Sequence, residues 1–154
     1  MNITDDIAGL RRILTRYRSI AVVGISANWY RPSYFAAKYM LDHGYQIFPV
    51  NPNYSEVLGR KCYPTIAAIP ESVDIVDCFR KPAEMVPLAH EAVAKGAKVL
   101  WMQLGISNDE AALIASAAGL DVVMNHCVKI EHARILGGLN WAGVNTGVIS
   151  SRRA

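Results

Sequence analysis

The chain has 154 residues, enough for one domain with a real core and too few for two. Its composition, 52% hydrophobic and 19% charged, fits a folded globular protein, and no apolar run approaches the roughly 18 residues that a membrane-spanning helix needs. The net charge of +3 is mild and spread along the chain, which argues against a nucleic-acid partner. The cysteine and histidine spacings indicate neither a disulfide framework nor a metal site. We therefore expect one cytoplasmic domain over residues 1–154.

An amphipathic helix is predicted first, over about residues 4–17, because its apolar residues fall on one helical face. Short apolar runs then alternate with helical patterns, and residues 54–70 are irregular apart from a helical turn near 65–69. The expected strands span residues 20–24, 45–50, 73–79, 98–102 and 121–124. The expected helices span residues 33–43, 83–95 and 108–118, with another helix start after Cys127 and a tail over about 140–154.

This alternation, with its short links, predicts right-handed crossovers and a parallel sheet. We expect an α/β fold, a Rossmann-like three-layer α/β/α sandwich with a five-stranded parallel sheet in the order 3-2-1-4-5. In such folds a ligand binds outside the carboxyl ends of the strands, where the strand order reverses. The residues that follow each strand are therefore the candidates for a binding site.

The segment after the first strand is typical of a phosphate-binding strand–loop–helix unit. Gly24 allows the turn, a polar loop follows, and Pro32 suits the first position of the next helix, whose free N–H groups can face an anion. The loop has one glycine and is not the dinucleotide fingerprint G-x-G-x-x-G. Alternatively, Ser26 is an ordinary turn residue and Arg31 a solvated charge. The candidate phosphate-binding residues are Gly24, Ile25, Ser26, Arg31, Pro32 and Ser33.

The end of the second strand, at Val50, Asn51 and Pro52, discriminates between cofactors. A NAD-binding domain usually has an acidic residue here to hold the ribose hydroxyls, and this chain has none. Arg60 and Lys61 follow, and they are candidates for contacting a ribose phosphate, unless they form a solvated loop. The missing acid argues against NAD.

The remaining strand ends add a cysteine and several residues that suit a ligand wall. Cys127 precedes a helix start, where a thiol can have a lowered pKa, although a buried apolar cysteine is the commoner case. No other residue is a catalytic candidate. The further binding candidates are Phe79, Arg80, Gln103, Gly105, Asn125 and Cys127.

Taken together, these segments resemble the stand-alone CoA-binding proteins of bacteria, which are similar to the N-terminal nucleotide-binding domain of the succinyl-CoA synthetase alpha subunit. The resemblance covers about residues 5–151. Its motifs are Val-Val-Gly-Ile-Ser at 22–26, Arg-Pro-Ser-Tyr at 31–34, Val-Asn-Pro at 50–52, Val-Asp-Cys-Phe-Arg at 76–80, Trp-Met-Gln-Leu-Gly at 101–105, Cys127, and the tail sequence at 143–151.

The resemblance implies coenzyme A as the ligand. It implies that Gly24 and Ser26 hold the pyrophosphate with Arg31 nearby, and that residues 50–52 line the adenosine side. Phe79 and Arg80 would flank the ligand, and Gln103 and Gly105 would lie toward the pantetheine end.

The resemblance also bears on activity. A synthetase of that kind needs a phosphohistidine in a later domain and a partner subunit, and no histidine of this chain has that context. The expected function is therefore non-catalytic binding of CoA or an acyl-CoA. The alternatives are a small NAD(P)-dependent oxidoreductase and a thiol-dependent acyl-CoA enzyme that uses Cys127. A regulatory role in a homodimer, or with an unidentified enzyme partner, stays open.

Overall fold

The computed structural model describes residues 2–137. The central strands are β1 (Ser19–Val23), β2 (Gln46–Val50), β5 (Ile75–Cys78), β6 (Val99–Met102) and β7 (Asp121–Val123). The helices are α1 (Ile7–Arg16), α2 (Pro32–Asp42), α3 (Met85–Lys95), α4 (Asp109–Ala117) and α5 (Val128–Ile135). The segment expected to be irregular forms a hairpin, β3 (Glu56–Val57) and β4 (Arg60–Lys61), and a 3₁₀ turn, η1 (Ile66–Ala68); a second 3₁₀ turn, η2 (Pro82–Glu84), leads into α3.

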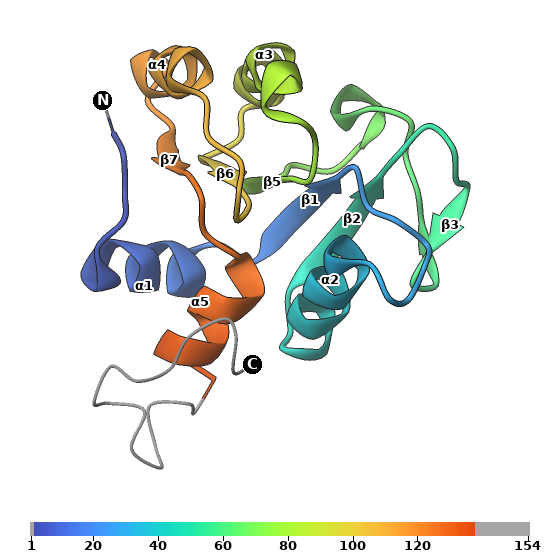
Figure 1. The fold of residues 1–154 in the computed structure, drawn as a ribbon. Coiled ribbons are helices and arrows are strands. Elements are labelled where there is room, and N and C mark those ends of the chain that lie inside the picture. The colour runs from blue at the N-terminus through green and yellow to red at the C-terminus, as the bar shows by residue number, and fades with distance from the viewer. Residues whose placement is uncertain (1, 138–154) are drawn as a thin grey trace.

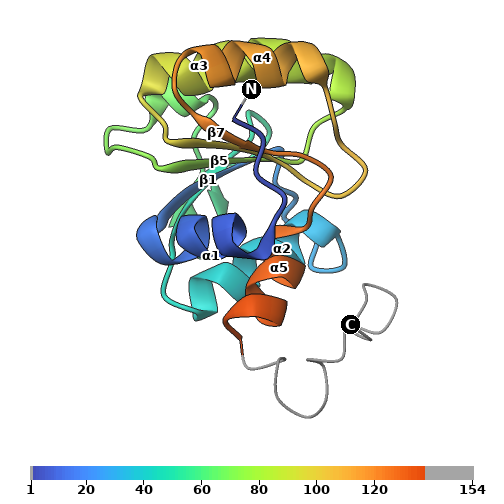
Figure 2. The same cartoon turned by 90° about the vertical axis from the view of Figure 1, so that its left-hand side faces the viewer.

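The elements form three layers, which confirms the expected α/β sandwich. Figure 1 shows α3 and α4 on one face of the sheet and α1, α2 and α5 on the other, and the turned view in Figure 2 separates the same layers. Each face has its own cluster of buried apolar side chains. No helix within residues 2–137 is long and apolar enough to cross a membrane. The expected tail at 140–154 and the sequence at 143–151 lie outside the described residues.

The order of the strands differs in one detail from the expectation. All pairings in the five-stranded sheet are parallel, and its order is β2-β1-β5-β6-β7, which is 2-1-3-4-5 along the chain rather than 3-2-1-4-5. β2 is therefore an edge strand. Its residue Pro49 has no N–H, and a proline within a strand suits only an edge position. The strand order consequently reverses between β1 and β5, where flavodoxin-like sheets bind their ligands.

The carboxyl ends of β1 and β5 approach each other so closely that only glycine fits at position 24. Gly24 has φ +86°, and a Cβ atom there would overlap the carbonyl oxygen of Phe79. Two hydrogen bonds fix the backbone here. The N–H of Gly24 donates to the carbonyl oxygen of Val50 at 2.9 Å, and the N–H of Phe79 donates to the carbonyl oxygen of Val23 at 2.8 Å. The expected role of Gly24 in the turn thus includes a steric requirement from the neighbouring strand.

This requirement predicts that Gly24→Ala lowers the free energy of unfolding by about 2 kcal/mol or more, because the substitution adds backbone strain and a clash. The matched control is Gly119→Ala, where φ is +91° and nothing lies within 4 Å of the added Cβ. Urea unfolding followed by circular dichroism measures both. Equal losses in the two variants would contradict the steric role of Phe79.

Candidate functional site

Three adjoining hollows lie along the carboxyl edge of the sheet, around the reversal of strand order. The first, the polar hollow, has a volume of about 400 Å³ and is lined by Gly24, Ser26, Asn28, Arg31, Pro32, Ser33, Tyr54 and Phe79. The second, the apolar hollow, has a volume of about 550 Å³ and is lined by Pro32, Phe79, Arg80, Lys81, Pro82, Gln103, Leu104, Ile106, Cys127 and Ile130. The third, the proline hollow, has a volume of about 340 Å³ and is lined by Val23, Val50, Pro52, Pro64, Thr65, Ile66, Arg80, Ala83, Glu84, Pro87, Leu88 and Glu91.

These hollows share walls, so a single extended ligand can contact all three. Pro32 and Phe79 line both the polar and the apolar hollow, and Arg80 lines both the apolar and the proline hollow. The predicted residues that line one or more hollows are Gly24, Ser26, Arg31, Pro32, Ser33, Val50, Pro52, Phe79, Arg80, Gln103 and Cys127. The predicted residues outside these linings are Ile25, Asn51, Arg60, Lys61, Gly105 and Asn125.

The loop between β1 and α2 is held in shape by its own side chains. The hydroxyl of Ser33 accepts a hydrogen bond from the backbone N–H of Ser26 at 3.0 Å, and the hydroxyl of Ser26 accepts one from Asn28 N–H at 3.1 Å. A hydroxyl that accepts in this way keeps its own hydrogen for donation. The loop is therefore organised by hydrogen bonds before any ligand arrives, and the Ser26 hydroxyl can still donate into the polar hollow.

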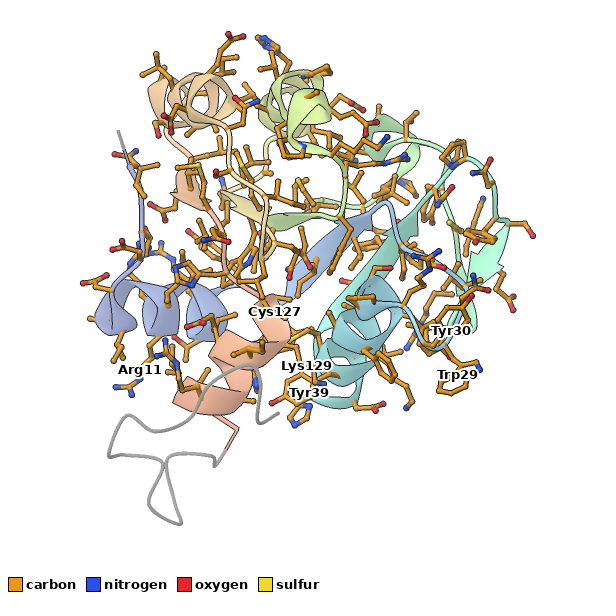
Figure 3. All side chains as sticks on the ribbon, viewed as in Figure 1. Arg11, Trp29, Tyr30, Tyr39, Cys127 and Lys129 are labelled. Atoms are coloured by element: carbon orange, nitrogen blue, oxygen red, sulfur yellow. The ribbon has the colours of Figure 1, made fainter. Side chains whose placement is uncertain are left out.

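The N-terminus of α2 lies at the polar hollow. The helix begins at Pro32, as the sequence predicts, and Arg31 is its N-cap residue, with no side-chain hydrogen bond to the helix. The free N–H groups and the macrodipole of a helix N-terminus favour an anion. Arg31 is exposed, with its guanidinium 5.8 Å from the ring centroid of Tyr30, and Trp29 and Tyr30 form the outer end of this loop (Figure 3). The polar hollow thus combines features that suit a phosphate group.

Asn51 braces the site from outside its lining. Its side-chain amide donates to the carbonyl of Ile25 at 2.9 Å, and its side-chain oxygen accepts from Asn53 N–H at 2.9 Å. This ties the end of β2 to the loop after β1, while the side chain of Ile25 is fully buried in the core. Asn51 and Ile25 therefore position the loop rather than line the hollow.

A second brace joins the loops after β6 and β7. The side-chain oxygen of Asn125 accepts from Gly105 N–H at 2.7 Å, and Asn125 has the left-handed backbone conformation, with φ 60°.

The two cationic candidates, Arg60 and Lys61, lie exposed on β4, with the Lys61 ammonium 5.2 Å from the ring centroid of Tyr63. Neither belongs to the three linings.

A buried polar pair lies at the floor of the apolar hollow, formed by the predicted residue Gln103 and by Asp77, which was not a predicted site residue. Asp77 is 1% exposed and Gln103 is 3% exposed, and the Gln103 amide nitrogen donates to the Asp77 carboxyl. Burial raises the pKa of Asp77 to about 7, and the hydrogen bond from Gln103 opposes part of that rise. The Gln103 side-chain oxygen accepts from Val128 N–H at 3.4 Å, which links the pair to the first turn of α5.

Cys127 does not have the lowered pKa that its place before a helix suggests. It is the N-cap residue of α5, at the start of that helix in Figure 3. Burial raises the pKa of the Cys127 thiol, and hydrogen bonds from the backbone N–H groups of Ile130 and Lys129 only partly offset this effect. The neighbouring His126 has its Nδ1 3.5 Å from the Glu131 carboxylate. The thiol is therefore protonated at neutral pH.

Several lining residues were missed by the sequence reading because they are apolar or lie within loops. Leu104 lies two residues after the buried strand β6, and its 56% exposure is known only from the structure. Tyr54 and Pro64 come from the segment expected to be irregular, where the sequence gives no periodic pattern. The other missed members of the polar and apolar linings are Asn28, Lys81, Pro82, Ile106 and Ile130.

Comparison with known proteins gives a consistent assignment. The CoA binding domain family matches residues 18–133. The uncharacterized protein YneT of Bacillus subtilis is 39% identical over 126 residues, which cover 82% of this chain and 93% of YneT. The ADP-forming acetate–CoA ligase II of Archaeoglobus fulgidus is 31% identical over 128 residues, covering 80% of this chain but only 19% of the ligase.

Solved structures extend the similarity to the fold. A hypothetical protein from Pyrococcus horikoshii superimposes with a TM-score of 0.84 at 47% identity, covering 86% of this chain and 94% of that protein. A Thermus thermophilus protein superimposes with a TM-score of 0.81 at 30% identity, covering 86% of this chain and 100% of that protein. In both cases the match covers nearly the full length of the other protein.

The buried carboxyl predicts a pH-dependent stability. The pKa of Asp77 is about 7 in the folded protein against an ordinary value of 3.8, so the unfolded chain loses this proton first as the pH rises. Protonated Asp77 therefore contributes its full share to the free energy of unfolding below about pH 4. This contribution declines as the pH rises through 7. Relative to wild type, Asp77→Asn should gain on the order of 3 kcal/mol between pH 4 and pH 8. Parallel curves of unfolding free energy against pH would contradict this.

The raised thiol pKa predicts slow alkylation of Cys127. Iodoacetamide reacts with the thiolate, so the rate at neutral pH should be lower in the folded protein than in the unfolded chain, and it should still be rising above about pH 9. Residue-resolved mass spectrometry separates Cys127 from the buried Cys62 and Cys78. Fast modification near pH 6, with no further increase in alkaline solution, would contradict the protonated thiol.

Proposed function

Because this chain belongs to the CoA binding domain family, we propose that it binds coenzyme A, free or as an acyl thioester, and catalyses no reaction of its own. The observation that carries the proposal is the set of three continuous hollows at the carboxyl edge of the sheet. Their chemistry corresponds to the three parts of coenzyme A, namely a phosphorylated adenosine, a diphosphate and a slender thiol-bearing arm.

The polar hollow suits the diphosphate. The N-terminus of α2, the hydroxyl of Ser26 and the guanidinium of Arg31 lie at this hollow. Groups of these kinds commonly donate hydrogen bonds to phosphate oxygens. Gly24 packs against the Phe79 carbonyl, and both residues line this hollow.

The proline hollow suits the adenosine. It adjoins the polar hollow through the neighbouring residues Val23 and Gly24, and Val50 and Pro52 give it apolar surface for a purine ring. Arg60 and Lys61 stay a prediction as partners of the ribose phosphate. The chain that follows them returns to β2 through the bridge between Tyr63 and Val50, which brings this hairpin toward the same strand end.

A dinucleotide such as NAD fits this edge less well. The side chain of Asn51, at the position usual for the ribose-binding acid, is engaged by Ile25 and Asn53. A neutral amide occupied in this way lacks the charge that holds two ribose hydroxyls. We therefore propose coenzyme A rather than NAD as the ligand.

We propose no catalysis by Cys127 because a nucleophilic thiol needs a lowered pKa or an activating base, whereas burial raises the pKa of this thiol. The acetate–CoA ligase of Archaeoglobus fulgidus shares with this chain only 19% of its length. The similarity to this part of the ligase supports binding of coenzyme A. It gives no support for the ligation reaction, which belongs to the whole ligase.

Isothermal titration with CoA, dephospho-CoA and NAD tests the proposal. We expect CoA to bind at least about tenfold more tightly than NAD, and Arg31→Ala to weaken CoA binding about tenfold, because it removes hydrogen bonds to a charged group. The control is Arg11→Ala, which removes the same charge from the exposed face of α1, away from the α2 loop (Figure 3).

The outcomes separate the parts of the proposal. Weaker binding of dephospho-CoA supports a contact from Arg60 or Lys61 to the ribose phosphate, and equal affinity removes that contact. NAD binding as tightly as CoA, or no binding of either compound, overturns the proposed function.

A further inference from the structure

On the premise of the proposed function, in which the thiol-bearing arm of coenzyme A enters the apolar hollow, we infer that this hollow also takes the acyl chain carried by that thiol, and that it selects apolar alkyl or aryl chains over acyl groups that end in a carboxylate. The inference identifies the ligand class as the thioester rather than the free thiol. It rests on the walls, the floor and the rim of this one hollow.

The walls of the apolar hollow are two opposed apolar surfaces. Pro32 begins α2, Phe79 follows β5 and Pro82 begins η2. Leu104 and Ile106 come from the loop after β6, and Ile130 comes from α5. The hollow has a volume of about 550 Å³, larger than the polar hollow at about 400 Å³. This volume lies within the range that encloses a small-molecule ligand.

The buried amide at the floor of the hollow is engaged at both ends. Gln103 is 3% exposed, its nitrogen donates to Asp77, and its oxygen accepts from Val128 N–H at 3.4 Å. A carboxylate placed against this floor would exchange its several hydrogen bonds to water for at most the second N–H of this amide, which is costly. A methylene group there loses nothing and gains from leaving water.

Charge at the floor acts in the same direction. Cys127 lines the hollow and Asp77 lies behind Gln103, and neither carries a positive charge that could pair with a carboxylate. The cationic lining residues, Arg80 and Lys81, come from the loop after β5. The Arg80 guanidinium lies 4.0 Å from Glu84, and Lys81 is exposed to solvent, where an ion pair contributes little. A carboxylate placed against the floor would therefore lie near Asp77 without a buried cation to pair with it.

Leu104 gives an independent indication that a chain covers this hollow. It is 56% exposed although it lies only two residues after a fully buried strand. Its side chain lines the hollow together with Ile106 and Ile130, which are only partly buried. An alkyl chain in the hollow would cover all three and remove their apolar surface from water.

A titration series tests the inference with CoA, acetyl-CoA, butyryl-CoA, hexanoyl-CoA and succinyl-CoA. We expect affinity to rise with chain length, with hexanoyl-CoA about tenfold or more tighter than CoA, since each buried methylene adds roughly a factor of four at full burial. Succinyl-CoA should bind no more tightly than acetyl-CoA.

A variant pair assigns the gain to this hollow. Leu104→Gln should reduce the ratio of CoA to hexanoyl-CoA dissociation constants several-fold. The control is Leu113→Gln, the same change at a leucine of α4 with 58% exposure and no part in the lining, and it should leave the ratio unchanged.

The results distinguish this inference from its premise. If CoA binds and the longer esters bind no more tightly, or if Leu113→Gln reduces the ratio as much as Leu104→Gln, the acyl hollow is wrong and the proposed function stands. If no ester and no CoA binds, both fail.

Discussion

The structure depends on the close approach of two parallel strands at the point where the sheet changes direction. Gly24 ends β1 with a left-handed backbone, and the carbonyl of Phe79, just after β5, occupies the space that a side chain would need. This contact brings the loop of the polar hollow next to Phe79 and Arg80, which line the other two hollows. The continuity of the site is therefore a consequence of one backbone contact.

The polar and apolar parts of the site lie on different loops around this contact. Hydrogen bonds between its own hydroxyl and N–H groups hold the loop after β1, and the Asn51 amide joins that loop to the end of β2. The apolar hollow instead rests on Asp77 and Gln103, which satisfy each other and the first turn of α5. The side chains of Asp77 and Gln103 are engaged with each other, and the remaining walls of the hollow are largely apolar.

Much of the fold could be predicted from the sequence, because alternating apolar runs and helical patterns constrain a parallel sheet strongly. The strand order could not be derived from that alternation alone, although Pro49 carried the information that β2 lies at an edge. The loop residues Gly24, Ser26, Arg31 and Pro32 were identified because turns and helix starts have local signatures.

The rest of the site depends on tertiary packing. Burial of Asp77 and the raised pKa of Cys127 depend on neighbours distant in sequence, so the local pattern suggested the wrong direction for the thiol. Likewise, Leu104 and Ile130 meet only because β6 and α5 are brought together by the sheet. Apolar ligand walls have no sequence signature that distinguishes them from core, which is why this part required the structure.

The most direct measurement of the central claim is an amide NMR titration of the labelled protein with coenzyme A. The account predicts that the perturbed resonances belong to the loops at the carboxyl edge, with Gly24, Ser26 and the first turns of α2 and α5 among them. Perturbations confined to the opposite, amino-terminal edge of the sheet, or a spectrum that coenzyme A leaves unchanged, would contradict it.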